Sequence, residues 1–376
     1  MGRRLARVTS RTMLTHVRHV TPVAPDAADG PVARVYRQMV DDFGVLAPPV
    51  LLHSPAPDVL RACWLMLRET LLAEGLVGRD AKEVVATAVS ESNRCPYCVE
   101  VHGATAAGLL GDAGGWLAAG VGGIGDRRLR ALAEWARHSG ADSPARRRRP
   151  PFPAEHGPEL IGVVVAFHYL NRMVSVFLQD SPLPPTPAGM RTGVRRTAAR
   201  IMGALARADR PPGRSLELLP PAPPEADLAW AVGQPHVAAA FARAGQAVRR
   251  RGEAALPEHV RRRVLACLAD APPPAPGGGR WVDAAVAELS PAERPAARLA
   301  LLTALAPYRV TDADVAACRA GGADDATLVA VTAWASLAAA RRIGARLYED
   351  GPAPPPAGVP GADLAVGEEA SRAGES

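Results

Sequence analysis

The chain has 376 residues, of which 48% are hydrophobic and 22% charged, and it carries a formal net charge of +6 with a sequence pI near 9.4. That length is more than one hydrophobic core usually holds, so two folded units with connecting segments are expected. Alanine is abundant, whereas isoleucine and aromatic residues are scarce, and this composition favours helix over sheet.

The basic charge does not indicate a nucleic-acid partner. Lys82 is the only lysine, and the arginines are spread along the whole chain. The one dense run, Arg146 to Arg149, lies between prolines and has no aromatic residues interleaved as stacking platforms. We therefore expect a solvated loop there and no nucleic-acid binding.

The N-terminal residues lack the continuous apolar stretch of a secretory signal, and no later segment is expected to have the length of a membrane span. The five cysteines form an odd, sparse set without the spacing of a disulfide framework, and only Cys95 and Cys98 are close neighbours. These features predict a soluble cytoplasmic protein with no membrane association, in which the pair is catalytic rather than structural. Three other cysteines are expected to be small buried hydrophobic residues, namely Cys63, Cys267 and Cys318.

Proline-rich stretches divide the chain into segments, because proline interrupts regular structure. The predicted order is a disordered N-terminus at 1–25, a helical domain at 26–182, a proline-rich linker with room for one helix at 183–225, a second helical domain at 226–350 and a disordered tail at 351–376.

The two halves also resemble each other. Residues 54–89 align without gaps on residues 233–268, and both segments have the pattern of two amphipathic helices with a short turn between them. Further on, residues 159–178 match residues 327–347 in position and apolar character. The sequence therefore predicts an all-α protein of two tandem helical units.

The segment Cys95-Pro96-Tyr97-Cys98 has the pattern of a helix start. Cys95 is at the N-cap position and Pro96 at the first helical position, where its missing N–H costs nothing. Cys98 then falls in the first turn, where the helix dipole favours a thiolate and thiol pKa values can drop to about 3.5–7.5. His102 follows four residues later on the same helical face, so that its imidazole can accept the thiol proton.

Glu83 adds a carboxylate from the preceding helical segment. It shares a face with Thr87 and Ser90, while valines and alanines on the other face supply packing. The carboxylate either orients His102, as the third group of a catalytic triad orients its base, or belongs to the surface of a helix that also carries Asp80 and Lys82.

The second half lacks these groups. The ungapped alignment places other residues at the positions of Cys95, Cys98, His102 and Glu83, namely Pro274, Gly277, Trp281 and Arg262. The second unit is therefore expected to be degenerate, a structural partner that helps to shape the pocket of the first.

The motif from Glu83 through Cys95-x-x-Cys98 to His102 resembles that of the AhpD-like alkylhydroperoxidases of the carboxymuconolactone decarboxylase superfamily. The resemblance is specific over residues 79–110, plausible over about 40–180 and weak over 230–348. It implies an all-α protein that self-associates into a homo-oligomer and reduces hydroperoxides with electrons from a thiol donor, without a metal or another cofactor.

The resemblance also implies roles for the four residues. Cys98 is the thiol that attacks the peroxide, Cys95 the resolving thiol, His102 the base and Glu83 the proton relay. Some members have a histidine between the two cysteines, where this chain has Tyr97. A tyrosine hydroxyl there can donate a hydrogen bond to a peroxide oxygen or can simply be packed.

Supporting residues around the thiols are Tyr97, Ser90, His168 and Asn171. His168 and Asn171 lie on a strongly apolar segment, and their counterparts in the second half are Ser336 and Ala339. These two polar side chains thus occur only in the half with the thiols, although a core histidine with satisfied hydrogen bonds is the more ordinary interpretation.

Three alternatives remain open from the sequence. The cysteine pair can serve as a protein thiol-disulfide exchanger, in which Cys95 would attack, but the βαβ pattern of a thioredoxin domain is missing. Cys95, Cys98 and His102 can bind zinc, although no nearby fourth ligand is evident. The chain can also be a non-catalytic scaffold whose site is vestigial.

Overall fold

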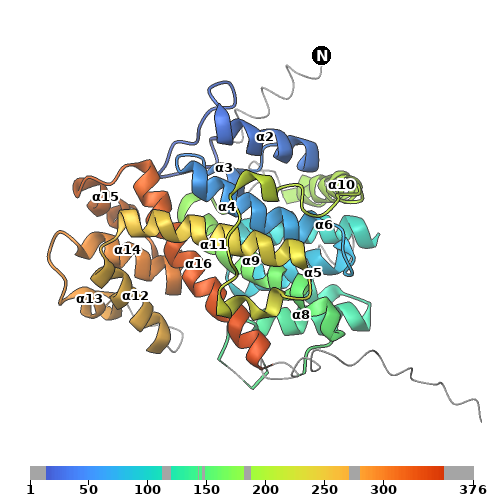
Figure 1. Cartoon of the computed structure of the whole chain (residues 1–376). Helices are drawn as coiled ribbons and strands as arrows, with labels where there is room; N and C mark the ends of the chain where they lie inside the picture. Colours follow the sequence, from blue (N-terminus) through green and yellow to red (C-terminus); the bar gives the residue numbers. More distant parts are fainter. Residues whose placement is uncertain are drawn as a thin grey trace, which may run out of the picture.

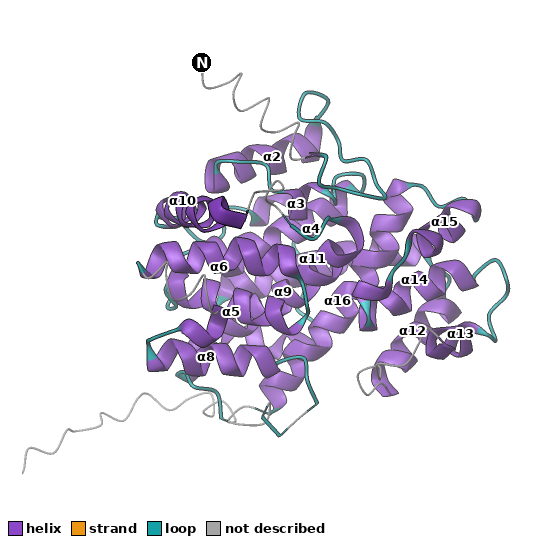
Figure 2. Ribbon diagram, turned by 180° about the vertical axis from the view of Figure 1, so that it is seen from behind, coloured by secondary structure: helices purple, strands orange, loops and turns teal. Residues whose placement is uncertain are grey.

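The computed structural model describes residues 14–111, 120–142, 144–145, 149–181, 188–270 and 280–350. Within these ranges the chain forms helices and no strand, and an isolated bridge between Val17 and Leu178 is the only β-type pairing (Figures 1 and 2). The all-α prediction is confirmed. Residues 1–13, Arg146–Arg148, the linker residues 182–187 and the tail 351–376, for which loops or disorder were predicted, lie outside the described residues.

The helices in chain order are α2 (Gly30–Phe43), α3 (Pro48–Leu51), α4 (Pro57–Leu67), a π-helical turn η1 (Arg68–Leu72), α5 (Arg79–Ser92), α6 (Pro96–Leu110), η2 (Gly120–Gly123), α8 (Arg127–His138), η3 (Ala154–His156), α9 (Gly157–Phe177), α10 (Ala188–Ala206), η4 (Leu216–Leu218), η5 (Ala226–Ala231), α11 (Pro235–Ala255), α12 (Glu258–Asp270), α13 (Arg280–Val286), α14 (Arg294–Leu305), η6 (Pro307–Arg309), α15 (Asp312–Ala320) and α16 (Asp325–Glu349).

The repeat seen in the sequence recurs in the helix boundaries. The alignment pairs Arg79 with Glu258, and these residues begin α5 and α12. The same holds for the later segment, since its offset pairs Gly157 with Asp325, the first residues of α9 and α16. Equivalent helices also pack against each other, α4 against α11 and α9 against α16, so that the two units meet along one shared core (Figure 1).

Helix α9 is the centre of the fold. Nearly all of its residues are buried. It contacts α4 and α5 of the first unit and α14 and α16 of the second. By length and composition the stretch Ala154–Phe177 could span a membrane, with a mean hydropathy of 1.6, so the expectation that no segment has that property was wrong. Since 89% of its most apolar window is buried inside the protein, its hydropathy matches its place in the core.

Residues 14–25 are ordered by contacts with distant parts of the chain. The backbone N–H of Arg18 donates to the carbonyl of Phe177, that of Thr21 donates to the Asp325 carboxylate, and Val20 is buried. The predicted disorder of residues 1–25 therefore does not extend through this stretch. Its local sequence gave no sign of partners that lie far away along the chain.

Helix α10 follows the first unit and lies across α6. Gly108 and Gly203 allow the close approach, because a Cβ added at either glycine would lie within 3 Å of backbone atoms of the other helix. This contact holds α10 over the N-terminal part of the first unit, where it forms one wall of the cavity described below.

Candidate active site

The two cysteines lie at the start of α6, in a tight connection from α5. Asn93 ends α5, Arg94 adopts a left-handed backbone conformation with φ of 54°, and Cys95 caps α6. Pro96 is the first helical residue, as its position in the motif predicted. The Cys95 carbonyl accepts the first helical hydrogen bond from Val99 N–H at 3.0 Å, which brings Cys98 into the first turn.

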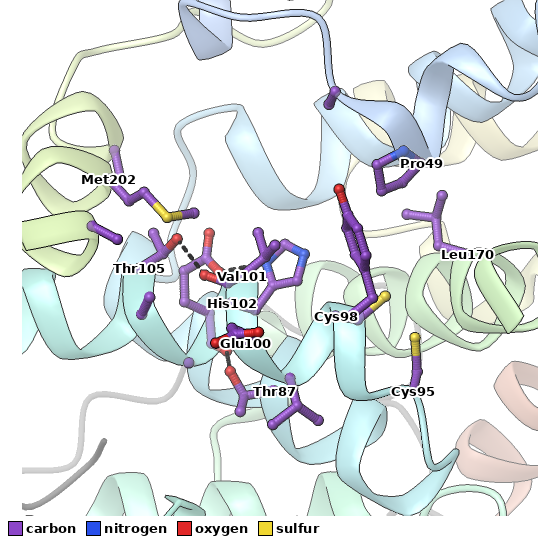
Figure 3. Close-up of a pocket in the computed structure, with 18 of the residues that line it drawn as sticks. Pro49, Thr87, Cys95, Cys98, Glu100, Val101, His102, Thr105, Leu170 and Met202 are labelled. Atoms are coloured by element: carbon purple, nitrogen blue, oxygen red, sulfur yellow. Dashed lines mark hydrogen bonds and ion pairs between the residues drawn. The ribbon is translucent and has the colours of Figure 1, made fainter. Parts of the chain in front are cut away.

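The thiols of Cys95 and Cys98 point toward each other and are both free (Figure 3). Both are buried, with 1% and 4% of their surfaces exposed. Burial and the neighbouring Cys95 raise the pKa of the Cys98 thiol well above its ordinary value, while a hydrogen bond from Asn171 lowers it. The helix dipole, from which the sequence predicted a lowered pKa, is opposed at this site by burial of the thiol.

Glu83 is a buried carboxylate, not a surface one. Its Oε2 lies 2.8 Å from His102 Nδ1, and its Oε1 accepts hydrogen bonds from Arg79 Nε at 2.8 Å and Nη2 at 2.6 Å. Burial alone would raise the pKa of Glu83, but the charges of Arg79 and His102 and their hydrogen bonds outweigh it, so that the pKa is lowered. An ionised Glu83 accepts the Nδ1 hydrogen of His102, which leaves Nε2 free to take a proton.

His102 is held on its other side by the ring of Phe167. The two rings meet edge to face with centroids 4.5 Å apart, and the His102 side chain is 16% exposed. Figure 3 shows the His102 ring and Cys98 on the same side of α6. The imidazole is thus fixed by a carboxylate and an aromatic ring while it keeps access to the cavity.

A cavity of about 1180 Å³ connects these groups. Its lining includes Cys95, Cys98, His102 and Glu83 on one side and apolar side chains of α10 on the other, namely Val194, Ala198, Ile201, Met202 and Leu205. Figure 3 shows Met202 of α10 beside Thr105, while Pro49 and Leu170 lie on the side of Cys98. The cavity can hold a small organic molecule next to the thiols.

The other predicted residues lie close to this centre. Tyr97 lines the cavity and is 4% exposed, and burial raises the pKa of its hydroxyl. Ser90 Oγ donates to the Ala86 carbonyl and accepts from Asn171. His168 and Asn171 are buried on α9 and are linked through Asn93.

Arg79 and Asn93 were missed from the sequence. Arg79 lies four residues before Glu83 on α5, so helical spacing could have paired the two. Asn93 gave no such signal, because its partners lie on α9, more than seventy residues later.

The second unit has no comparable centre in the part of it that the structure describes. Arg262, at the position of Glu83, is an exposed residue of α12 whose Nε lies 3.6 Å from the Glu258 carboxylate. Pro274 and Gly277, which align with the cysteines, lie outside the described residues.

The remaining cysteines do not join the pair. Cys63 and Cys318 are buried, and burial raises the pKa of both thiols, that of Cys318 to about 11. Cys267 is half-buried. Among the described residues no three His, Cys, Asp or Glu side chains gather in the arrangement of a metal site.

The chain is similar to a curated protein over most of its length. The chain is 40% identical over 333 residues to an alkyl hydroperoxide reductase of Mycobacterium tuberculosis, and the match covers 87% of this chain and 94% of that protein. No family model matches the chain, and no solved structure matches it significantly. The all-α fold and the identity over nearly the whole length of both proteins show that the chain belongs to the AhpD-like alkylhydroperoxidase family.

Proposed function

We propose that the protein is a thiol-dependent peroxidase that reduces organic hydroperoxides at Cys98. One observation carries the proposal: two free, adjacent thiols share a cavity with a histidine that a buried carboxylate orients. The name of the mycobacterial relative supports a hydroperoxide as the substrate.

In the proposed first step, His102 Nε2 takes the proton of Cys98, and the resulting thiolate attacks the terminal oxygen of the hydroperoxide. The O–O bond breaks, Cys98 becomes a sulfenic acid, and the leaving alkoxide takes a proton from His102 to form the alcohol. Glu83 stabilises the imidazolium between these two transfers, because its carboxylate remains ionised beside Nδ1.

In the second step, the thiol of Cys95 attacks the sulfenic acid of Cys98. A disulfide forms and water leaves, so that the two thiols together supply the two electrons that reduce the peroxide. The two thiols lie next to each other in Figure 3, which favours this condensation. An external thiol donor then reduces the disulfide.

Burial favours this activity over exchange with protein disulfides. A protein disulfide would have to reach Cys95, which is 1% exposed, whereas a small hydroperoxide can enter through the cavity. Oxidation of the two thiols requires no metal in this scheme, because a proton neutralises the leaving alkoxide oxygen. The second unit acts as a structural partner, and self-association stays a prediction.

The proposal is tested with fully reduced protein and one equivalent of cumene hydroperoxide, without a donor. We expect one alcohol formed and two thiols lost per peroxide, and turnover once a suitable dithiol is supplied. Cys98→Ser is the control and should consume no peroxide. Unchanged thiol content after exposure to the peroxide would contradict the proposal.

A further inference from the structure

Helix α10 presents an apolar stripe to the cavity. Residues of α10 that line the cavity lie three or four positions apart and therefore share one face of the helix, namely Val194, Ala198, Ile201, Met202 and Leu205. From the first to the last of them the helix rises by about 16 Å. Figure 3 shows Met202 beside Thr105, which is further along α6 than the thiols.

The stripe is not the surface that packs α10 against α6. That contact is made by small residues, since Ala199 is buried and a Cβ added at Gly108 or Gly203 would lie within 3 Å of backbone atoms of the facing helix. Ile201 and Leu205 are 57% and 44% exposed, and neither belongs to the hydrophobic core that the described residues form. Large apolar side chains that line a cavity without being buried indicate a surface that a ligand covers.

The outer end of the cavity is apolar on both sides. Val45, in the connection between α2 and α3, also lines the cavity and is 43% exposed. A Cβ added at Gly44 would lie 3.7 Å from Leu205 Cδ2, so this connection comes next to α10. Cys95 and Cys98 are buried at the inner end. The cavity thus extends from the thiols to an apolar edge that solvent reaches.

The charged groups of the lining have partners within the protein. Three arginines of the lining lie within 4 Å of a carboxylate of the same lining, in the pairs Arg79–Glu83, Arg195–Glu100 and Arg210–Asp42. The guanidinium carbon of Arg94 lies 5.7 Å from the ring centre of Tyr308 in the second unit. An anion in the cavity would have to compete with these partners, so the lining favours an uncharged molecule.

We propose that Ile201, Met202 and Leu205 are specificity-determining residues that bind the hydrocarbon chain of the substrate, an uncharged alkyl hydroperoxide with a long chain. The inference rests on the proposed function, because the hydroperoxide group must lie at Cys98 while the chain extends along α10. The cavity of about 1180 Å³ exceeds the range of about 300–1000 Å³ that holds a typical organic ligand, and a short hydroperoxide would leave the stripe uncovered.

The first measurement is binding without turnover, and its probes are the primary alcohols that such hydroperoxides would leave. Reduced protein is titrated by calorimetry with 1-butanol, 1-hexanol and 1-octanol. We expect Kd to fall about two- to fourfold for each added methylene. Octanoate has nearly the same length but carries a charge, and it should bind at least about tenfold more weakly than 1-octanol. Equal affinity for 1-butanol and 1-octanol, or tighter binding of octanoate, would overturn the inference.

Matched variants test whether the chain lies on α10. Leu205→Ser should weaken binding of 1-octanol about tenfold, because it removes apolar surface that the chain covers. Leu265→Ser on α12 is the control, since Leu265 is similarly exposed, at 46%, and does not line the cavity. It should bind 1-octanol as the unmodified protein does. Ile201→Ser is the second variant of the stripe, and unchanged affinity in both stripe variants would overturn the inference.

The oligomeric state distinguishes a substrate from a second copy of the chain as the molecule that covers the stripe. Light scattering is measured on the unmodified protein and on Leu205→Ser. We expect the same molar mass for both. A lower mass in Leu205→Ser together with unchanged affinity for 1-octanol would show that the stripe is an interface between copies, and the inference would be wrong.

Turnover separates this inference from the proposed function. We expect kcat/KM to be at least about 100-fold higher for octyl than for ethyl hydroperoxide, and this ratio should fall about tenfold in Leu205→Ser. Similar values for the two hydroperoxides would overturn the inference and leave the peroxidase function standing. Binding of 1-octanol that depends on Leu205, in a protein that consumes neither hydroperoxide, would support the binding surface and contradict the proposed function.

Discussion

Glu83 Oε2 lies 2.8 Å from His102 Nδ1, so that a buried carboxylate on α5 holds an imidazole on α6. The partner determines what the imidazole can do. In the mechanism that we propose, the Nδ1 hydrogen of His102 is donated to Glu83 and Nε2 acts as the base, so that the positive charge gained on protonation faces a negative one.

Glu83→Gln should slow peroxide reduction strongly while the protein stays folded. The amide can still contact His102, but it does not stabilise the imidazolium, and a positioned proton-transfer group is worth about 10²–10⁴-fold in rate. We expect kcat/KM for cumene hydroperoxide to fall at least about 100-fold. Glu258→Gln, at an exposed carboxylate of the second unit, is the matched control and should have the rate of the unmodified protein.

The two cysteines should behave differently when each is replaced. Cys95→Ser should react once with a hydroperoxide and accumulate sulfenic or over-oxidised Cys98, because no resolving thiol remains. Cys98→Ser should not react measurably. Mass spectrometry after one equivalent of peroxide distinguishes the variants, and a sulfenic adduct on Cys95 in Cys98→Ser would show that the roles are reversed.

Much of this site follows from local sequence. Spacing within a short segment predicts where α6 begins, at Cys95, and that Cys98 lies in its first turn. Spacing also predicts the faces of α5 and α6 that carry Glu83 and His102, because helical geometry converts spacing into position. The tandem helices were predictable for the same reason, since amphipathic periodicity marks each one.

The burial of these residues could not be predicted from the local sequence. Cys98 has a raised pKa because elements distant in the sequence bury it, among them α9, whose Leu170 lines the same cavity. The order of residues 14–25 likewise depends on partners as remote as Asp325. Local patterns predict which groups meet on one helix but not how completely the rest of the chain removes water from them.

The reduced protein should form little Cys98 thiolate at neutral pH. Burial disfavours the charged form, so the pKa of the thiol is raised and the thiolate fraction grows about tenfold for each pH unit below it. Alkylation of Cys98 by iodoacetamide should therefore accelerate steadily from pH 7 to beyond pH 9. A plateau below pH 8, measured by the rate of mass increase at Cys98, would mean that the dipole of α6 dominates after all.

The raised pKa of Cys98 also makes the stability of the folded protein depend on pH. A thiol that is harder to ionise in the folded state than in the unfolded chain stabilises the fold fully below its unfolded pKa, near 9, and this contribution is lost as the pH rises toward the folded value. The free energy of unfolding under reducing conditions should thus fall above pH 9. The fall should be smaller in Cys98→Ser, by up to about 1.4 kcal/mol per pH unit. An equal fall in both proteins would indicate that Cys98 ionises normally.

Removal of the second unit should prevent the first from folding alone. A chain that ends at residue 225 loses α11 and α16, which cover α4 and α9, and exposes an apolar face of α9 that now packs around Gly344 and Ser336. Arg172 Nε also loses the Ala304 carbonyl to which it donates at 2.9 Å. Exposed apolar faces of this kind lead to aggregation, so we expect the truncated chain to lack a cooperative thermal transition by circular dichroism and to elute as aggregates.

A chain that ends at residue 350 keeps every described helix and is the control. A soluble, cooperatively unfolding chain of residues 1–225 with a reactive Cys98 would instead make the two units independent domains.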